Sequence, residues 1–113
     1  MPATKFDLLP GTLEMMVLKS LTAGPMHGYA ISRRIRERSK EALVVEEGSL
    51  YPALHRMERR HWIEAEWGRS ETNRRAKYYK LTRKGRGELK VQEDTWSRLT
   101  GAVAQVMRAQ AVR

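Results

Sequence analysis

The stretch from residue 48 to residue 82 constrains the fold of this chain more than any other part of its 113 residues. Its first apolar side chains repeat at the spacing of one helical face: Leu50, Leu54 and Met57. Three short segments follow, an alternating one, a polar turn and an aromatic-rich one: residues 63–67, 68–75 and 77–81. This order predicts a helix from about Ser49 to His61 that leads directly into an antiparallel hairpin.

Pro52 limits where that helix can begin. Proline fits the first turn of a helix, where its missing N–H would have no partner, and it disrupts later turns. The sequence therefore predicts that Pro52 lies in the first turn.

Further helices are predicted on both sides of this stretch. Two of them precede it, at about residues 10–22 and 27–39. Thr82 is a suitable N-cap for a long last helix over about residues 83–109. Residues 1–9 are expected to form a loose arm with three apolar side chains that could dock it: Phe6, Leu8 and Leu9. The predicted fold class is mainly α with a small antiparallel β-hairpin.

The positive charge of the chain is concentrated in two blocks. There are 22 Lys and Arg against 13 Asp and Glu, which gives a net charge of +9. Residues 33–40 carry five basic side chains and one acidic one, and residues 69–86 carry eight and one. A charge that served only solubility would not need this clustering, so the blocks favour a polyanionic partner such as nucleic acid.

The predicted helix and hairpin carry side chains that suit DNA. In a helix-turn-helix module the second helix presents its first turns to the major groove, and the helix before it crosses the phosphate backbone. An arginine-rich hairpin tip can reach phosphate or a narrow minor groove. The alternatives are an ordinary core helix and a solvated hairpin tip. The candidate DNA-binding residues are Ser49, Tyr51, Pro52, His55, Arg56, Arg59, Arg34, Arg69, Arg74, Arg75 and Lys77.

Two series of residues, each seven apart, run along the predicted last helix. They are Leu89, Trp96 and Val103, and Gln92, Leu99 and Val106. Such a seam predicts a homodimer interface made by these residues. Trp96 is either a packing anchor or a stacking surface for a flat aromatic ligand. Three glycines each weaken an isolated helix by about 1 kcal/mol, so this helix should be packed on its own domain or a second copy: Gly85, Gly87 and Gly101.

Several other residue types argue against catalysis, cofactors and membranes. The chain has no cysteine, which fits a reducing cytoplasm, and its three histidines lack the i, i+4 spacing of a metal site. His27 is expected to bond backbone groups beside Gly28 instead. Trp62 and Trp67 flank the first hairpin strand and are expected in the core or at a hinge. No nucleophile motif, phosphate loop or membrane-length apolar run is present, so the sequence predicts no enzyme and no membrane protein.

With these residues in hand, the chain resembles the PadR family of bacterial transcriptional regulators over nearly its whole length. The matching segments are GTLEMMVLKSL at 11–21, MHGYAISRRI at 26–35, EEGSLYPALHRMERRHWIEAEW at 46–67 and RRAKYYKLTRKGRGEL at 74–89. His61 departs from the pattern, since many relatives have glycine there.

The resemblance implies a winged helix-turn-helix domain over residues 1–82 and a dimerisation helix over residues 83–113. It also implies a homodimer that represses transcription by binding an inverted repeat in double-stranded DNA, and that a small molecule often releases. An adaptor that uses a winged helix to bind other proteins is the alternative function, and the two basic blocks argue against it.

Overall fold

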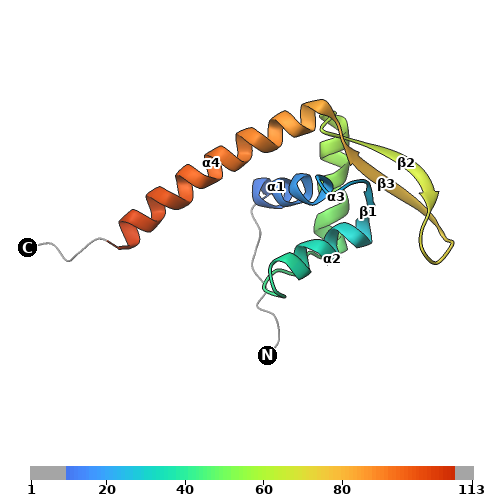
Figure 1. Ribbon diagram of the computed structural model, residues 1–113, viewed down its shortest axis with the longest axis horizontal. Coiled ribbons are helices and arrows are strands. Elements are labelled where there is room, and N and C mark those ends of the chain that lie inside the picture. Colours follow the sequence, from blue (N-terminus) through green and yellow to red (C-terminus); the bar gives the residue numbers. More distant parts are fainter. Residues whose placement is uncertain (1–9, 109–113) are drawn as a thin grey trace, which may run out of the picture.

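The computed structural model describes residues 10–108, and Figure 1 shows how its helices and strands are arranged. Within these residues the elements follow in this order: α1 (Pro10–Leu21), β1 (Met26–His27), α2 (Gly28–Arg38), α3 (Glu47–Arg59), β2 (Ile63–Arg69), β3 (Arg75–Leu81) and α4 (Arg83–Met107). The predicted fold class is confirmed. The predicted arm with Phe6, Leu8 and Leu9, and the predicted end of the last helix at Ala109, lie outside the described residues.

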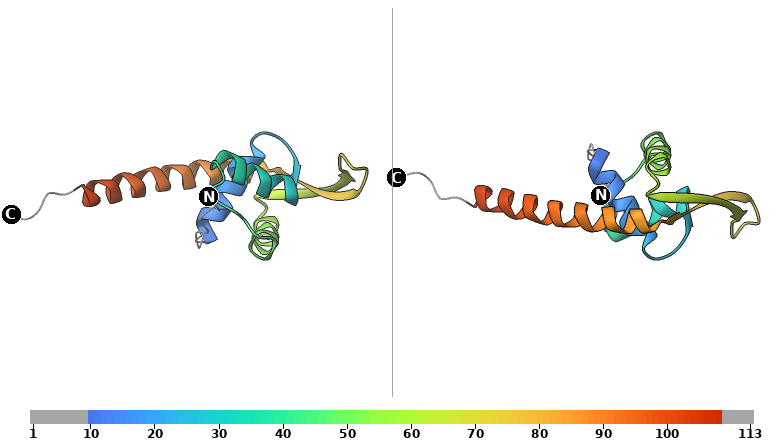
Figure 2. Two further views of the ribbon diagram at one scale, coloured as in Figure 1. Left: turned by 90° about the horizontal axis from the view of Figure 1, so that it is seen from below. Right: turned by 90° about the horizontal axis from the view of Figure 1, so that it is seen from above.

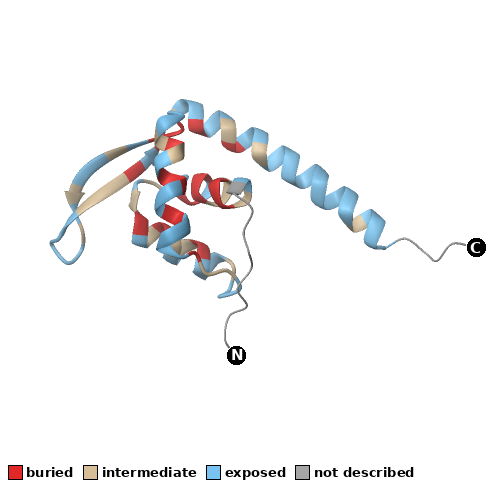
Figure 3. Ribbon diagram, turned by 180° about the vertical axis from the view of Figure 1, so that it is seen from behind, coloured by how far each residue is buried: buried red, intermediate tan, exposed pale blue. Residues whose placement is uncertain are grey.

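One apolar core lies between the first three helices and the sheet. The first helix, α1, packs against α2, α3, α4 and β3, and its Val17 and Leu18 are fully buried. The predicted apolar stripe of α3 is buried as well: Leu50, Leu54 and Met57. Figure 3 shows the buried residues gathered in this body, whereas most of α4 is exposed. No helix in residues 10–108 is long and apolar enough to cross a membrane.

The sheet has three antiparallel strands in the order β1-β3-β2. The predicted hairpin forms β2 and β3, with Ile63 opposite Leu81 and Arg69 opposite Arg75. The sequence did not predict β1, whose Met26 lies opposite Tyr79 of β3. Two residues are too few to create an alternating pattern, so this strand depends on the partner that β3 provides.

The position of Pro52 differs from the prediction. Helix α3 begins at Glu47, so Pro52 is its sixth residue and lies in the second turn. It therefore withholds the N–H that would bond the carbonyl of Gly48. Because Gly48 is exposed, water can satisfy that carbonyl, which makes a proline tolerable here.

The C-terminal end of α3 has the hydrogen bonds of a Schellman cap. The N–H of His61 donates to the carbonyl of Glu58 at 2.9 Å, and the N–H of Trp62 donates to the carbonyl of Met57 at 3.0 Å. Such a cap needs a left-handed residue, and His61 has a φ of 61°. A histidine thus makes this left-handed turn, at a cost in backbone strain.

A tight joint connects this cap to the start of α4. The Thr82 hydroxyl donates to the carbonyl of His61 at 2.6 Å and accepts from the N–H of Gly85 at 3.0 Å. A Cβ atom on Gly85 would lie 1.9 Å from the carbonyl oxygen of Trp62. Gly85 is therefore required for the close approach of α4 to the body, in addition to weakening the helix.

The two halves of α4 have different surroundings. Leu89 is only 6% exposed and belongs to the core of the chain itself, so its predicted place in a dimer seam is corrected. Leu89 is buried because the first turns of α4 pack on α1 and β3. Farther along, the helix leaves the body in the direction opposite to the β2–β3 hairpin, as the two views of Figure 2 show. The described molecule is accordingly elongated, with extents of 64 × 37 × 22 Å.

Candidate nucleic-acid interface

The exposed face of α3 carries five of the predicted DNA-binding residues: Ser49, Tyr51, Pro52, His55 and Arg59. Tyr51 packs against the start of α2, where a Cβ atom on Gly28 would lie 2.7 Å from the tyrosine hydroxyl. The absence of a side chain at Gly28 thus allows α3 and α2 to come together. The other four side chains are available to a ligand approaching α3.

Arg56, a further candidate on α3, has a different environment. Its Nε donates to the Glu14 carboxylate at 3.1 Å, and Arg60 donates to the other oxygen of that carboxylate at 3.3 Å. Glu14 is only 5% exposed and lies on α1. A buried carboxylate requires such partners, so Arg56 is best assigned to holding α3 against α1. The sequence could not reveal this pair, since 42 residues separate its members.

The β2–β3 hairpin, residues 63–81, forms a wing whose tip is held by its own hydrogen bonds. Arg69 donates from Nη1 to the carbonyl of Asn73 at 3.2 Å, and Asn73 has a left-handed φ of 60°. The N–H of Ser70 donates to the carbonyl of Arg74 at 2.8 Å, closing the turn. Arg74 and Arg75 are both exposed at this tip.

Lys77 connects the wing to α3. Its ammonium lies 3.2 Å from the Glu58 carboxylate, and it is 5.6 Å from the centre of the Tyr79 ring. Burial raises the pKa of the Tyr79 hydroxyl above its usual value, and the nearby charge of Glu58 adds to the effect. The Tyr79 ring is therefore an uncharged neighbour for the ammonium group. Through its ion pair with Glu58, Lys77 holds the wing against α3.

A groove between α3 and the wing brings several predicted residues together. Tyr51 and His55 line its α3 side, and Arg74, Arg75 and Lys77 line its wing side. Arg34 does not line this groove. It lies on α2, where it shares a neighbouring depression with Arg74 and the residues of the wing turn. The predicted phosphate-contacting side chains thus lie on the wing side of the groove and, in the case of Arg34, in the depression beside it.

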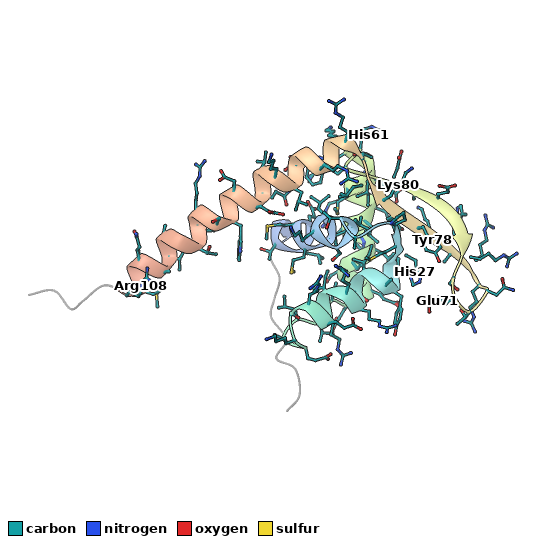
Figure 4. All side chains as sticks on the ribbon, viewed as in Figure 1. His27, His61, Glu71, Tyr78, Lys80 and Arg108 are labelled. Carbon is teal, nitrogen blue, oxygen red and sulfur yellow. The ribbon has the colours of Figure 1, made fainter. Side chains whose placement is uncertain are left out.

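Four aromatic side chains that the sequence did not single out for DNA also line the groove: His27, Tyr29, Trp67 and Tyr79. His27 caps α2, because its Nδ1 accepts the N–H of Ala30 at 3.2 Å, which confirms the expected backbone bond. Its ring meets Tyr78 of β3 edge-on at 5.4 Å (Figure 4). Trp67 was expected in the core or at a hinge, but it is 57% exposed.

The exposure of Trp67 follows from where β2 runs. Ile63, Ala65 and Trp67 share one face of the strand, and Ile63 and Ala65 are buried and half-buried respectively. Burial falls along this face because the strand leaves the body as it approaches the wing tip. Trp62, which precedes β2, is buried, as expected for a core residue. The basic residues of β3, the strand that pairs with β2, were the signal that Trp67 would lie among cations.

The outer half of α4 carries the remaining predicted interface residues. Trp96, Leu99, Val103 and Val106 are all exposed, and Trp96 is 44% exposed. Trp96 and Leu99 line a largely apolar groove with Met15 of α1 and with Gln92. The Gln92 side-chain oxygen is buried without a hydrogen-bond partner among the described residues. This surface is separate from the α3–wing groove.

Within residues 10–108 no group of three or more His, Cys, Asp or Glu side chains is placed to hold a metal ion.

Comparison with known proteins identifies the fold's family. Residues 17–91 match the transcriptional regulator PadR-like family. The chain belongs to this family of transcriptional regulators. The recognition made from the sequence is therefore confirmed.

Solved structures of PadR-like and related regulators superpose well on this chain. A transcriptional regulator from Clostridium thermocellum is 30% identical with a TM-score of 0.77, over 84% of this chain and 92% of that one. A PadR-like regulator from Bacillus cereus is 28% identical with a TM-score of 0.76, over 88% and 95% of the two chains. A relative found by sequence, protein X of Lysinibacillus sphaericus, is 29% identical over 91 residues, which are 80% of this chain and 84% of its own length.

Membership of the PadR-like family gives the α3–wing groove its general meaning. The family consists of transcriptional regulators, and membership implies regulation by DNA binding. Such regulators are generally not enzymes. The groove combines the exposed face of a helix-turn-helix helix with a basic two-stranded ribbon.

Proposed function

We propose that this chain is a homodimeric DNA-binding repressor in which each copy reads one half of an inverted repeat. The observation that supports this best is the groove in which α3 faces the basic wing. A helix of this kind enters the major groove, and a basic ribbon beside it reaches the neighbouring backbone or minor groove. A DNA partner also implies the cytoplasm as the site of action.

The side chains divide into two roles in this proposal. Those on the exposed face of α3 contact base edges and the atoms beside them: Ser49, Tyr51, Pro52, His55 and Arg59. Arginines of α2 and the wing contact phosphates or the minor groove: Arg34, Arg69, Arg74 and Arg75. Arg56 and Lys77 act through Glu14 and Glu58, since these ion pairs orient α3 and the wing.

The outer half of α4 is the proposed dimer contact. It exposes Leu99, Val103 and Val106 on the predicted seam, and burial of this surface by a second copy removes apolar area from water. The division of the chain into a DNA-binding part and a dimerisation helix then falls within α4, after Leu89. Two copies would place their recognition helices about 34–36 Å apart, one turn of DNA.

A planar aromatic effector is the proposed release signal. The groove at Trp96 offers an aromatic ring and an apolar lining, and the unpartnered oxygen of Gln92 can accept a hydrogen bond from a bound molecule. A protein in which Phe replaces Trp62 and Trp67 would report on Trp96 alone. Quenching by planar aromatics is expected, and no response across a broad set would leave Trp96 as packing.

Titration of fluorescent DNA from upstream of the protein's own gene tests the main proposal. We expect affinity at least about 1,000-fold higher than for scrambled DNA at physiological salt. If each copy contacts about three phosphates, the logarithm of affinity should fall with the logarithm of salt at a slope of about −5. Affinity that is indifferent to both sequence and salt would refute the proposal.

A further inference from the structure

One exposed aromatic side chain of the wing is paired with a cation. The guanidinium carbon of Arg75 lies 4.4 Å from the centre of the Trp67 ring. Trp67 lies opposite Lys77 in the strand register, and Arg75 lies opposite Arg69, so Trp67 and Arg75 are diagonal neighbours on one face of the hairpin. The wing thus presents an arginine that is already stacked on an indole.

The wing has separate support on its opposite face. The Tyr78 ring lies against Gly68, where an added Cβ atom would be 3.2 Å from it, and the Tyr78 hydroxyl donates to the carbonyl of Arg69 at 2.8 Å. Glu64 and Lys80 form an ion pair on that same face. The hairpin is therefore braced without Trp67, more than half of which remains in solvent.

The surroundings of the Trp67–Arg75 pair suit an anion. Its groove with α3 is lined by Arg74, Arg75 and Lys77 on the wing, and none of the described residues that line it is a carboxylate. Arginine inserts readily into narrow, A·T-rich minor grooves, where the negative potential is enhanced. A free arginine must give up rotamer freedom to do so, and stacking on an aromatic ring removes part of that cost in advance.

We propose that Trp67 is a positioning residue for DNA binding, which holds Arg75 extended so that the pair contacts an A·T-rich minor groove flanking each half-site. This inference rests on the proposed function of the α3–wing groove. The indole supplies the cation–π contact and covers apolar sugar atoms, while the guanidinium enters the groove. Arg74, one residue earlier, stacks on no aromatic ring of the described residues and lacks this preorganisation.

A double-mutant cycle on DNA affinity tests the pairing. Trp67→Ala and Arg75→Ala are each expected to weaken binding about tenfold, and the double variant should be little weaker than either single one. Trp67→Ala combined with Arg74→Ala is the matched control, in which the two losses should multiply. Trp67→Phe keeps a ring face and should restore most of the affinity. Independent losses for Trp67 and Arg75 would overturn the proposal.

A sequence readout separates positioning from support of the fold. Once footprinting has located the half-sites, replacing A·T by G·C pairs in the flanks should weaken the unchanged protein about tenfold and leave Trp67→Ala nearly unaffected. A fold defect would instead lower affinity equally on both DNAs. Equal sensitivity of the two proteins to the flanks would therefore contradict the proposal.

Fluorescence gives a second, direct measurement. With Phe in place of Trp62 and Trp96, Trp67 is the remaining tryptophan, and its emission should change when DNA with an A·T flank is added. Prior occupation of that flank by the minor-groove ligand netropsin should abolish the change. Emission that responds to another protein but not to DNA would point to a protein-binding wing. If the unchanged protein binds DNA specifically and these results fail, only the Trp67 inference fails.

Discussion

The wing and the outer half of α4 are two arms that leave the body in opposite directions (Figure 1). They expose opposite kinds of surface. The turn of the wing is held by its own hydrogen bonds, and the wing presents arginines, among them Arg74 and Arg75. The outer half of α4 presents apolar side chains, such as Leu99 and Val106, to solvent. The difference indicates two kinds of partner: a polyanion for the wing, and an apolar surface such as a second copy for α4.

Replacing Leu99 by Asp is the most severe test of this contrast. A charge placed in an apolar contact has no partner there, so the variant should be a monomer by light scattering at about 10 µM. Its affinity for a two-half-site DNA should fall at least about 100-fold, because the second half-site no longer benefits from linkage. Arg74→Asp is the matched control on the other arm, and should lose DNA binding while staying dimeric. A dimer in the Leu99→Asp protein would show that the contact lies elsewhere.

The joint at the base of α4 determines how the two arms are connected. Gly85→Ala should destabilise the protein by about 3 kcal/mol in urea denaturation, because its Cβ atom would meet the Trp62 carbonyl oxygen at 1.9 Å. Gly87 has no atom within 4 Å of an added Cβ, so Gly87→Ala should instead stabilise the helix by about 0.5–1 kcal/mol. Similar stability of the two variants would mean that the close approach is not kept in solution.

The contrast between the arms also marks what the sequence could predict. Periodicity located α3, the hairpin and α4, because each is long enough to show its repeat. A seven-residue repeat indicates that side chains are buried, but it does not show whether they pack on the same chain or on a second copy. The repeat therefore could not distinguish Leu89, which lies in the core, from Leu99, which is exposed. The two-residue β1 has no repeat at all, and the roles of Arg56 and Gly85 depend on Glu14 and Trp62, which are distant in sequence. Local patterns predict elements, whereas contacts between elements decide which arginine or glycine is structural.

Both arms depend on α3 being held in the body, and Glu14 tests that attachment. Glu14→Gln removes the charge that pairs with Arg56 and Arg60, and should lower the free energy of unfolding by about 2 kcal/mol. Glu37→Gln breaks an exposed ion pair with Arg33, and the change in the free energy of unfolding should be too small to measure. DNA affinity should fall in the Glu14 variant, since α3 loses its orientation. Equal effects of the two substitutions would mean that the buried carboxylate does not hold the helix.

The smallest expected effect lies at the cap between α3 and β2. His61 has a left-handed φ of 61°, which glycine adopts without the steric cost that a β-carbon brings. His61→Gly should therefore raise the free energy of unfolding by about 1 kcal/mol, measured by urea denaturation. His61→Ala keeps the β-carbon and should show no such gain. Because the His61 carbonyl still accepts from Thr82 in both variants, DNA affinity and the dimer should be unchanged. A stabilised His61→Gly protein with altered DNA binding would show that the imidazole itself takes part in one arm's contacts.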